Sequence, residues 1–320
     1  MNKFYLRCLW ILAVVFVIGL SSCRKMSQSV PSYIHIDSIT VDPQTDYYTY
    51  GAATSNITDA WVYLDDNILG CFELPATFPI IAKGPHKISI RGGICENGRG
   101  SARGPYPFYQ WAVYKDLNLV EDSIINLNPQ MVYYPINEGV NVGWMEDFET
   151  TNSLISMSQS DTSVVAVSYL DDPFVWYHNP NSYRSGRIDL PPDSLDFYVA
   201  SADEMSFHND YVDFCLLEMD YNCNDTFFVG VTYLEDYAIN LHPLVKVLPT
   251  DKQNDRPNVW KKMYVNIGPF INEHTVADYF KLYFTSNLSV AESLGQSPYY
   301  PLNEPRHYYF DNLKVLYRPR

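Results

Sequence analysis

Short runs of strand-forming residues follow one another along almost the whole chain, and this feature limits its possible folds most strongly. The runs are rich in Tyr, Phe, Val, Ile and Thr, residue types that fit a pleated sheet, and Pro, Gly, Asn and Asp separate them. The 320 residues include 27 tyrosines and 21 prolines, and no stretch with helical periodicity exceeds about two turns. The sequence therefore predicts an all-β, folded protein.

The first half contains the clearest hairpin. Two strand-like runs flank Asp65-Asp66-Asn67, residue types whose short polar side chains support tight turns. Further on, Ile88 and Ile90 alternate with polar residues, as in a half-buried strand. This order of strands and turns resembles small surface-layer modules of the PEGA or immunoglobulin-like kind. We therefore predict a small β-sandwich over residues 33–138.

The second half contains about eight strand-like runs with long polar connections, which favour another β-sandwich. Phe148-Glu149 near its start and the final run Asp311-Asn312-Leu313-Lys314-Val315 resemble the paired first and last strands of jelly-roll carbohydrate-binding modules. The resemblance implies a jelly roll over residues 139–320. Within it, residues 273–281 are the best short-helix candidate, although the overlapping run over residues 279–284 suits a strand equally well.

The same resemblance implies a structural calcium ion bound by Glu149 and Asp311. Carboxylates from neighbouring strands, completed by backbone carbonyls, suit a cation that takes six to eight oxygen ligands. Such an ion would stabilise the sandwich and would take no part in catalysis. The alternative is that both residues are solvated carboxylates at a sheet edge.

The N-terminus carries the features of an export signal. Lys3 and Arg7 precede an apolar run over residues 8–20, which is too short to span a bilayer as a helix. The following Leu-Ser-Ser-Cys resembles the bacterial lipoprotein signal, in which the cysteine, here Cys23, is lipidated and becomes the first residue. Residues 1–22 would then be removed and residues 23–32 would form a lipid-bearing tether. A plain secretory signal or a short anchor is the alternative.

Together with this leader, the jelly-roll motifs resemble exported lipoproteins of the Bacteroidota, and this resemblance implies a palmitate-bearing anchor in the outer membrane. Arg24-Lys25-Met26 follow the cysteine, where acidic residues would resemble a surface-export signal. The sequence therefore leaves open whether the protein faces the periplasm or the exterior.

Four cysteines remain after Cys23, and an export compartment permits disulfides. Cys71 and Cys95 lie on separate strand-like runs, and we predict a disulfide between them. Cys215 and Cys223 lie on one strand-like run, whose eight-residue span of roughly 26 Å far exceeds the ~4.4–6.8 Å between the Cα atoms of a disulfide. We therefore predict that these two cysteines are not joined to each other.

Charge and motifs exclude several classes of function. Removal of residues 1–22 leaves 20 basic against 37 acidic residues, a net charge of −17, which would repel nucleic-acid phosphates. The seven histidines show no zinc-binding spacing, and no nucleophile elbow is present. The sequence thus indicates a protein that is not an enzyme.

A glycan-binding surface would need exposed aromatic rings, because their apolar faces stack on sugar C–H groups. Trp176 and Tyr177, in a loop-like segment, are the first candidates, and Tyr299 and Tyr300 are the second. Core packing is the alternative for each ring. We predict a non-catalytic outer-membrane lipoprotein that binds glycan; the alternative is a structural or accessory subunit of a cell-envelope complex.

Overall fold

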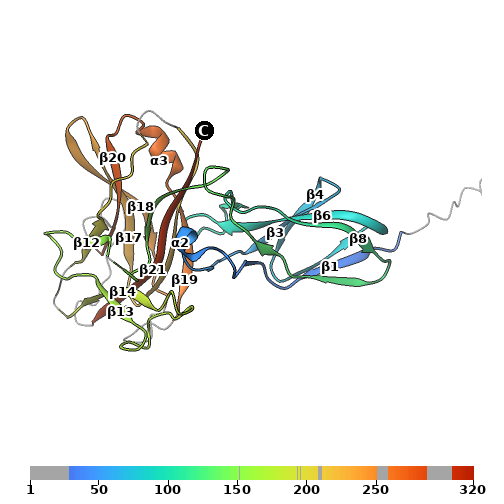
Figure 1. The fold of residues 1–320 in the computed structure, drawn as a ribbon, viewed down its shortest axis with the longest axis horizontal. Helices are drawn as coiled ribbons and strands as arrows, with labels where there is room; N and C mark the ends of the chain where they lie inside the picture. The colour runs from blue at the N-terminus through green and yellow to red at the C-terminus, as the bar shows by residue number, and fades with distance from the viewer. Residues whose placement is uncertain are drawn as a thin grey trace, which may run out of the picture.

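The computed structural model describes residues 29–150, 152–192, 194, 196–207, 211–250, 259–286 and 305–320. Two β-sandwiches lie end to end along an elongated molecule (Figure 1). No helix within these described ranges is long and apolar enough to cross a membrane. The predicted leader, the lipidation site Cys23 and the ring pair Tyr299 and Tyr300 lie outside the described residues.

The N-terminal sandwich is built from the strands that precede residue 132. Its elements are β1 (Ser32–Ile36), β2 (Thr40–Val41), α2 (Tyr47–Tyr50), β3 (Asp59–Leu64), β4 (Asn67–Glu73), β5 (Ala76–Ile80), β6 (Gly84–Cys95), β7 (Arg103–Pro105), β8 (Ala112–Leu119), β9 (Ile124–Leu127) and β10 (Gln130–Met131). One sheet has the order β5-β1-β9, and a second has the order β4-β3-β6-β7 with β8 also paired to β6. Strands β2 and β10 form a separate pair.

Local sequence explains the predicted hairpin of this sandwich. Asp65 and Asp66 both adopt positive φ angles, 47° and 66°, in the turn between β3 and β4, and aspartate tolerates this conformation better than most residues. Ile88 and Ile90 of β6 are fully buried, as their alternation predicts. They join Ile34 and Phe78 of the facing sheet in one apolar core.

The C-terminal sandwich contains two larger sheets. Its elements are β11 (Asn141–Glu146), β12 (Leu154–Ser156), β13 (Val165–Ser168), β14 (Arg184–Leu190), β15 (Tyr198–Ser201), β16 (Val212–Cys223), β17 (Phe227–Glu235), β18 (Ala238–Val247), β19 (Lys261–Asn266), α3 (Gly268–Glu273), β20 (Tyr279–Thr285) and β21 (Arg306–Pro319). One sheet has the order β13-β14-β21-β16-β19, with β11 also paired to β21, and the other has the order β12-β15-β20-β17-β18. The all-β fold class is thus as predicted.

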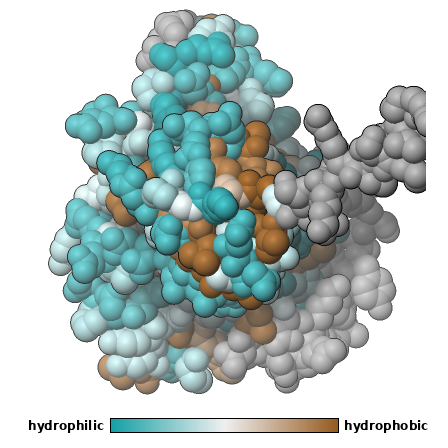
Figure 2. All heavy atoms as spheres, turned by 90° about the vertical axis from the view of Figure 1, so that its right-hand side faces the viewer, coloured by the Kyte–Doolittle hydropathy of each residue, from teal (hydrophilic) through white to brown (hydrophobic). Residues whose placement is uncertain are grey.

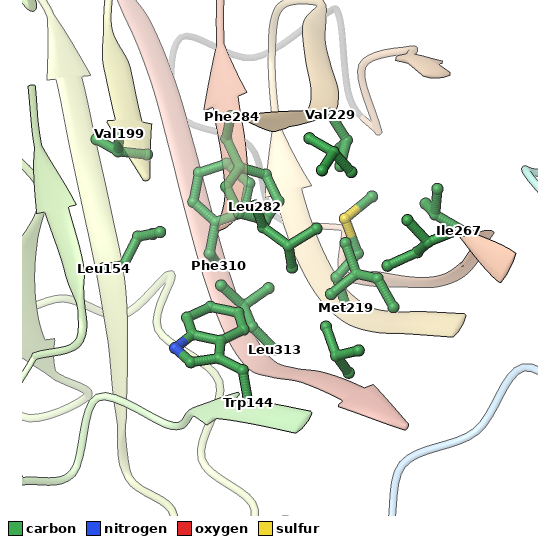
Figure 3. Packing of buried hydrophobic residues seen from close by; sticks show 14 of the residues in the cluster. Trp144, Leu154, Val199, Met219, Val229, Ile267, Leu282, Phe284, Phe310 and Leu313 are labelled. Atoms are coloured by element: carbon green, nitrogen blue, oxygen red, sulfur yellow. The ribbon is translucent and has the colours of Figure 1, made fainter. Parts of the chain in front are cut away.

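Apolar side chains of these two sheets meet in a single core, drawn in Figure 3. Met219, Phe310 and Leu313 come from the first sheet, and Val229 and Leu282 from the second. An early strand does pair with the last one, because β11 runs antiparallel to β21 with Glu146 opposite Leu313. Phe148-Glu149, the residues on which this prediction rests, lie just beyond the end of β11. The short helix α3 ends at residue 273 and β20 begins at residue 279, so the predicted helix over 273–281 is wrong: the segment is mostly a turn that leads into β20.

The two sandwiches are joined through the outer face of the sheet that contains β16, β19 and β21. Leu216, Tyr264 and Leu316 on that face belong to the apolar core of the N-terminal sandwich. The turn between β6 and β7 also reaches this sheet: Asn97 N donates to Tyr264 O at 2.7 Å, and Asn266 Nδ2 donates to Glu96 Oε2 at 2.9 Å. The predicted domain boundary at 138/139 falls between β10 and β11.

A charged network is buried within this junction. Glu218 is fully buried and lies 2.9 Å from Lys262 Nζ and 3.4 Å from Lys314 Nζ. Tyr133 of the N-terminal sandwich donates its hydroxyl to Glu218 Oε1 at 2.9 Å, and Tyr106 donates to the same oxygen. Burial alone would raise the pKa of Glu218, but the two lysines outweigh burial and hold this pKa at about 2. The junction is therefore ionic as well as apolar.

Candidate functional site

A cleft of about 510 Å³ lies where the two sandwiches meet. One wall is the segment of residues 43–53, which contains α2, and the other is the loop of residues 179–181 between β13 and β14. The polar and aromatic residues that line it are Gln44, Thr45, Asp46, Tyr47, Tyr48, Asn179 and Asn181. The two walls come from segments far apart in the sequence, so only the folded chain forms this cleft.

Polar contacts hold the α2 wall in place, both within the helix and between the helix and the C-terminal sandwich. Asp46 caps α2, since its Oδ1 accepts from Tyr48 N at 3.3 Å and its Oδ2 accepts from Thr49 Oγ1 at 2.5 Å. Tyr47 donates its hydroxyl to Asp147 Oδ2 at 2.9 Å, which ties the helix to the C-terminal sandwich. Burial and the neighbouring Asp147 raise the pKa of Tyr47, so this hydroxyl stays a donor. Tyr48 leaves its side chain 79% exposed at the cleft.

The opposite wall is a tight loop. Asn179 Oδ1 accepts from Asn181 N at 2.8 Å, and the backbones of Asn179 and Ser182 form an isolated bridge. This local bonding fixes the loop that presents Asn179 and Asn181 to the cleft. Amide side chains can both donate and accept hydrogen bonds. An exposed phenol ring beside several amides can therefore bind a ligand with apolar C–H faces and many hydroxyl groups.

The predicted rings Trp176 and Tyr177 lie just before the loop that forms this wall. Tyr177 is 46% exposed, and its ring centroid lies 4.6 Å from that of the exposed Tyr169. Trp176 is half-buried, with its ring 3.9 Å from that of His178 and 5.6 Å from that of Trp260. Neither predicted ring lines the cleft.

Sequence reasoning missed Tyr47 and Tyr48, the two rings that do line it. A signal was present in the sequence, because these tyrosines follow Pro43 and Asp46, residues typical of a turn or a helix start. A pair of tyrosines directly after such residues is placed near the surface, where a ring can remain accessible. Because the chain contains 27 tyrosines, this signal was not enough to distinguish the pair from the many that pack in the core.

The predicted calcium ligands Glu149 and Asp311 lie near each other beside β14. Glu149 Oε1 accepts from the backbone N–H groups of Tyr183 and Arg184, both at 2.6 Å. Asp311 is fully buried, and Ser185 donates its hydroxyl to Asp311 Oδ2 at 3.2 Å. Neither is a solvated edge carboxylate.

Electrostatics favour a cation near this pair, but the set of ligands is incomplete. Burial, followed by repulsion from Asp220, raises the pKa of Asp311 well above its usual range, and burial raises the pKa of Glu149. Glu149 Oε2 is buried and has no hydrogen-bond partner within the described part of the chain. Within those same ranges, no three His, Cys, Asp or Glu side chains are arranged to hold a metal ion.

The predicted disulfide between Cys71 and Cys95 is wrong, since both are free cysteines. Strand β3 lies between β4, which carries Cys71, and β6, which carries Cys95. Cys71 is opposite Trp61, and Trp61 is opposite Arg91, four residues before Cys95. Two strand spacings of about 4.8 Å plus a four-residue offset separate the two cysteines far beyond disulfide distance. Cys215 and Cys223 are buried on β16 and are also free.

Comparison with solved structures finds similar folds at low sequence identity. A family 11 carbohydrate-binding module from Clostridium thermocellum, in complex with a β-1,3-1,4-mixed-linked tetrasaccharide, is 8% identical with a TM-score of 0.33, over 55% of this chain and 94% of the module. A family 30 carbohydrate-binding module is 13% identical with a TM-score of 0.31, over 54% of this chain and 81% of the module. At this level the similarity concerns the β-sandwich fold alone. No protein-family model and no curated protein matches the chain.

Proposed function

We propose that this protein is a non-catalytic glycan-binding protein and that the cleft between α2 and the loop of residues 179–181 is its binding site. The observation that carries the proposal is the exposed ring of Tyr48 in a cleft that also contains the amides of Gln44, Asn179 and Asn181. A sugar ring can stack on the phenol while its hydroxyl groups exchange hydrogen bonds with the amides. The cleft volume of about 510 Å³ is sufficient for a short oligosaccharide.

Charge narrows the class of glycan. The net charge is −15 for the whole chain, and Asp46 adds a carboxylate to the cleft itself. A polyanionic glycan would be repelled by this field, so the proposed ligand is a neutral or amino-bearing glycan. Binding of a neutral glycan should also depend little on salt concentration, because no net charge attraction contributes to it.

A glycan array tests this proposal on the chain of residues 24–320, which retains every residue that the structure describes. We expect binding to neutral oligosaccharides and an affinity loss of up to about tenfold in Tyr48→Ala, the upper range for loss of one stacking ring. Tyr237→Ala is the matched control, because Tyr237 is a fully exposed tyrosine in the turn between β17 and β18. Absence of glycan binding, or equal binding by Tyr48→Ala, would contradict the proposal.

We further propose that Cys23 is lipidated and anchors the protein in the outer membrane. Support comes from the leader sequence, in which an apolar run and Leu-Ser-Ser precede Cys23. Cells fed radiolabelled palmitate should incorporate label into the wild-type protein and not into Cys23→Ser. Equal labelling of the two chains, or recovery of the wild type in the soluble fraction, would refute the anchor.

Calcium is a separate proposal, supported by the buried Asp311 and the unpartnered Glu149 Oε2. Added calcium should raise the melting temperature of the wild type, because the ion would neutralise two neighbouring carboxylates. Asp311→Asn should lose this response, and without calcium it should be at least as stable as the wild type, since it removes a poorly compensated buried charge. A wild-type melting temperature that calcium does not change would reject the site.

The alternative function, an accessory subunit of an envelope complex, is favoured by a different surface. Strand β18 is the edge of its sheet, and it exposes Ile239 and Leu241. An unpaired edge with apolar side chains is a common docking surface for another protein. If no glycan binds while Ile239→Ser/Leu241→Ser abolishes co-purification of one defined envelope protein, this alternative replaces the first.

A further inference from the structure

Exposed aliphatic side chains gather at the end of the N-terminal sandwich where the chain enters it. Val30 is 46% exposed, Ile81 73%, Val120 51% and Ile124 61%. We call this group the entry face. Figure 2 looks onto this end of the molecule and shows apolar patches near its centre, with hydrophilic residues between and around them.

Backbone contacts place these side chains around the start of β1. Ser32 is opposite Ile80, the residue before Ile81, and Tyr33 is opposite Ile124. On the other side, Asp122 N donates to Pro31 O at 3.0 Å. The segments that carry Ile81, Val120 and Ile124 therefore flank the first described residues of the chain.

We propose that the entry face rests on the surface of a phospholipid bilayer; this inference depends on the proposed lipid anchor. Cys23 precedes Val30 by seven residues, so the extended tether spans at most about 25 Å. A lipid on Cys23 would hold this end of the sandwich close to the headgroups, where aliphatic side chains gain by leaving water.

Charge favours the same orientation. Arg24 and Lys25 lie in the tether and supply its positive charge. Beside the entry face, Lys83 is paired with Glu121 at 3.7 Å, so this pair adds no net charge. Cationic residues near a bilayer are attracted to anionic headgroups by roughly 1 kcal/mol each, whereas the acidic remainder of the chain is repelled. The C-terminal sandwich, at the opposite end in Figure 1, would then project away from the membrane and leave the junction cleft accessible.

Vesicle flotation tests the proposal with the chain of residues 24–320 and vesicles of phosphatidylethanolamine and phosphatidylglycerol. We expect the wild-type chain to float with the vesicles and the partition coefficient to fall about tenfold in Ile81→Ser/Ile124→Ser, since two partly inserted side chains are lost. The matched control is Leu170→Ser/Val276→Ser, which removes two side chains of similar exposure on the C-terminal sandwich. All three chains should melt at similar temperatures, because the altered residues are exposed.

Each outcome separates membrane contact from its alternatives. A wild-type chain that does not float, or an equal loss in Leu170→Ser/Val276→Ser, overturns the proposal. A dimer in sedimentation velocity that Ile81→Ser/Ile124→Ser abolishes would assign the entry face to a second copy of this chain instead. The tested chain lacks Cys23, so a negative result leaves the palmitate experiment on the anchor unaffected, and the flotation result does not depend on lipidation.

Discussion

Replacing Glu218 by glutamine should show how much the ionic contacts of the junction, as distinct from its apolar contacts, contribute to the stability of the folded chain. The substitution keeps the shape of the side chain but removes the charge that faces Lys262 and Lys314. The pKa of Glu218 is lowered from 4.5 to about 2, and at ~1.4 kcal/mol per pH unit this corresponds to about 3 kcal/mol of stability. Removal of one partner from a buried ion pair costs about 3–5 kcal/mol, which agrees with this value.

The pH dependence of this loss has a definite sign. Because the folded-state pKa lies below the unfolded value, the contribution of Glu218 is present above pH 4.5 and disappears as pH falls towards 2. Urea denaturation at pH 7 should therefore show Glu218→Gln less stable by about 3 kcal/mol, and the difference should shrink steadily below pH 4.5. Glu121→Gln, which breaks an exposed pair with Lys83, is the control and should cost less than about 1 kcal/mol. A loss at pH 7 no larger than that of the control would refute the reasoning.

Two further predictions concern packing and thiol chemistry. A Cβ added at Gly230 would lie 2.3 Å from the ring of Tyr283. Gly230→Ala should therefore destabilise the folded chain by about 1–3 kcal/mol, measured in a thermal melt. An unchanged melting temperature would show that the ring moves freely. In the native protein a thiol reagent should modify the exposed Cys71, whereas the two thiols on β16 should react only after unfolding, because burial raises the pKa of Cys215 and of Cys223. Loss of Cys71 reactivity that a reductant restores would indicate a disulfide after all.

Features that depend only on residues close together in the sequence were predictable. The Asp65-Asp66 turn follows from residue types that accept positive φ angles. The burial of Ile88 and Ile90 follows from their alternation with polar residues. The fold class follows from many such short segments, each of which favours a strand.

Features that depend on which strands become neighbours were not predictable. The error over Cys71 and Cys95 arose because β3 lies between the strands that carry them. Glu218 alternates with apolar residues and would normally face water, but the N-terminal sandwich covers it. The cleft combines residues 43–53 with residues 179–181, and nothing in either segment indicates the other.

A crystal structure of the chain with its strongest glycan ligand from the array tests the central claim most directly. We predict one sugar ring stacked on Tyr48, with its hydroxyl groups hydrogen-bonded to the amides of Gln44, Asn179 or Asn181. A sugar bound at the exposed Tyr169–Tyr177 pair instead, with the cleft between α2 and residues 179–181 occupied only by water, would contradict it.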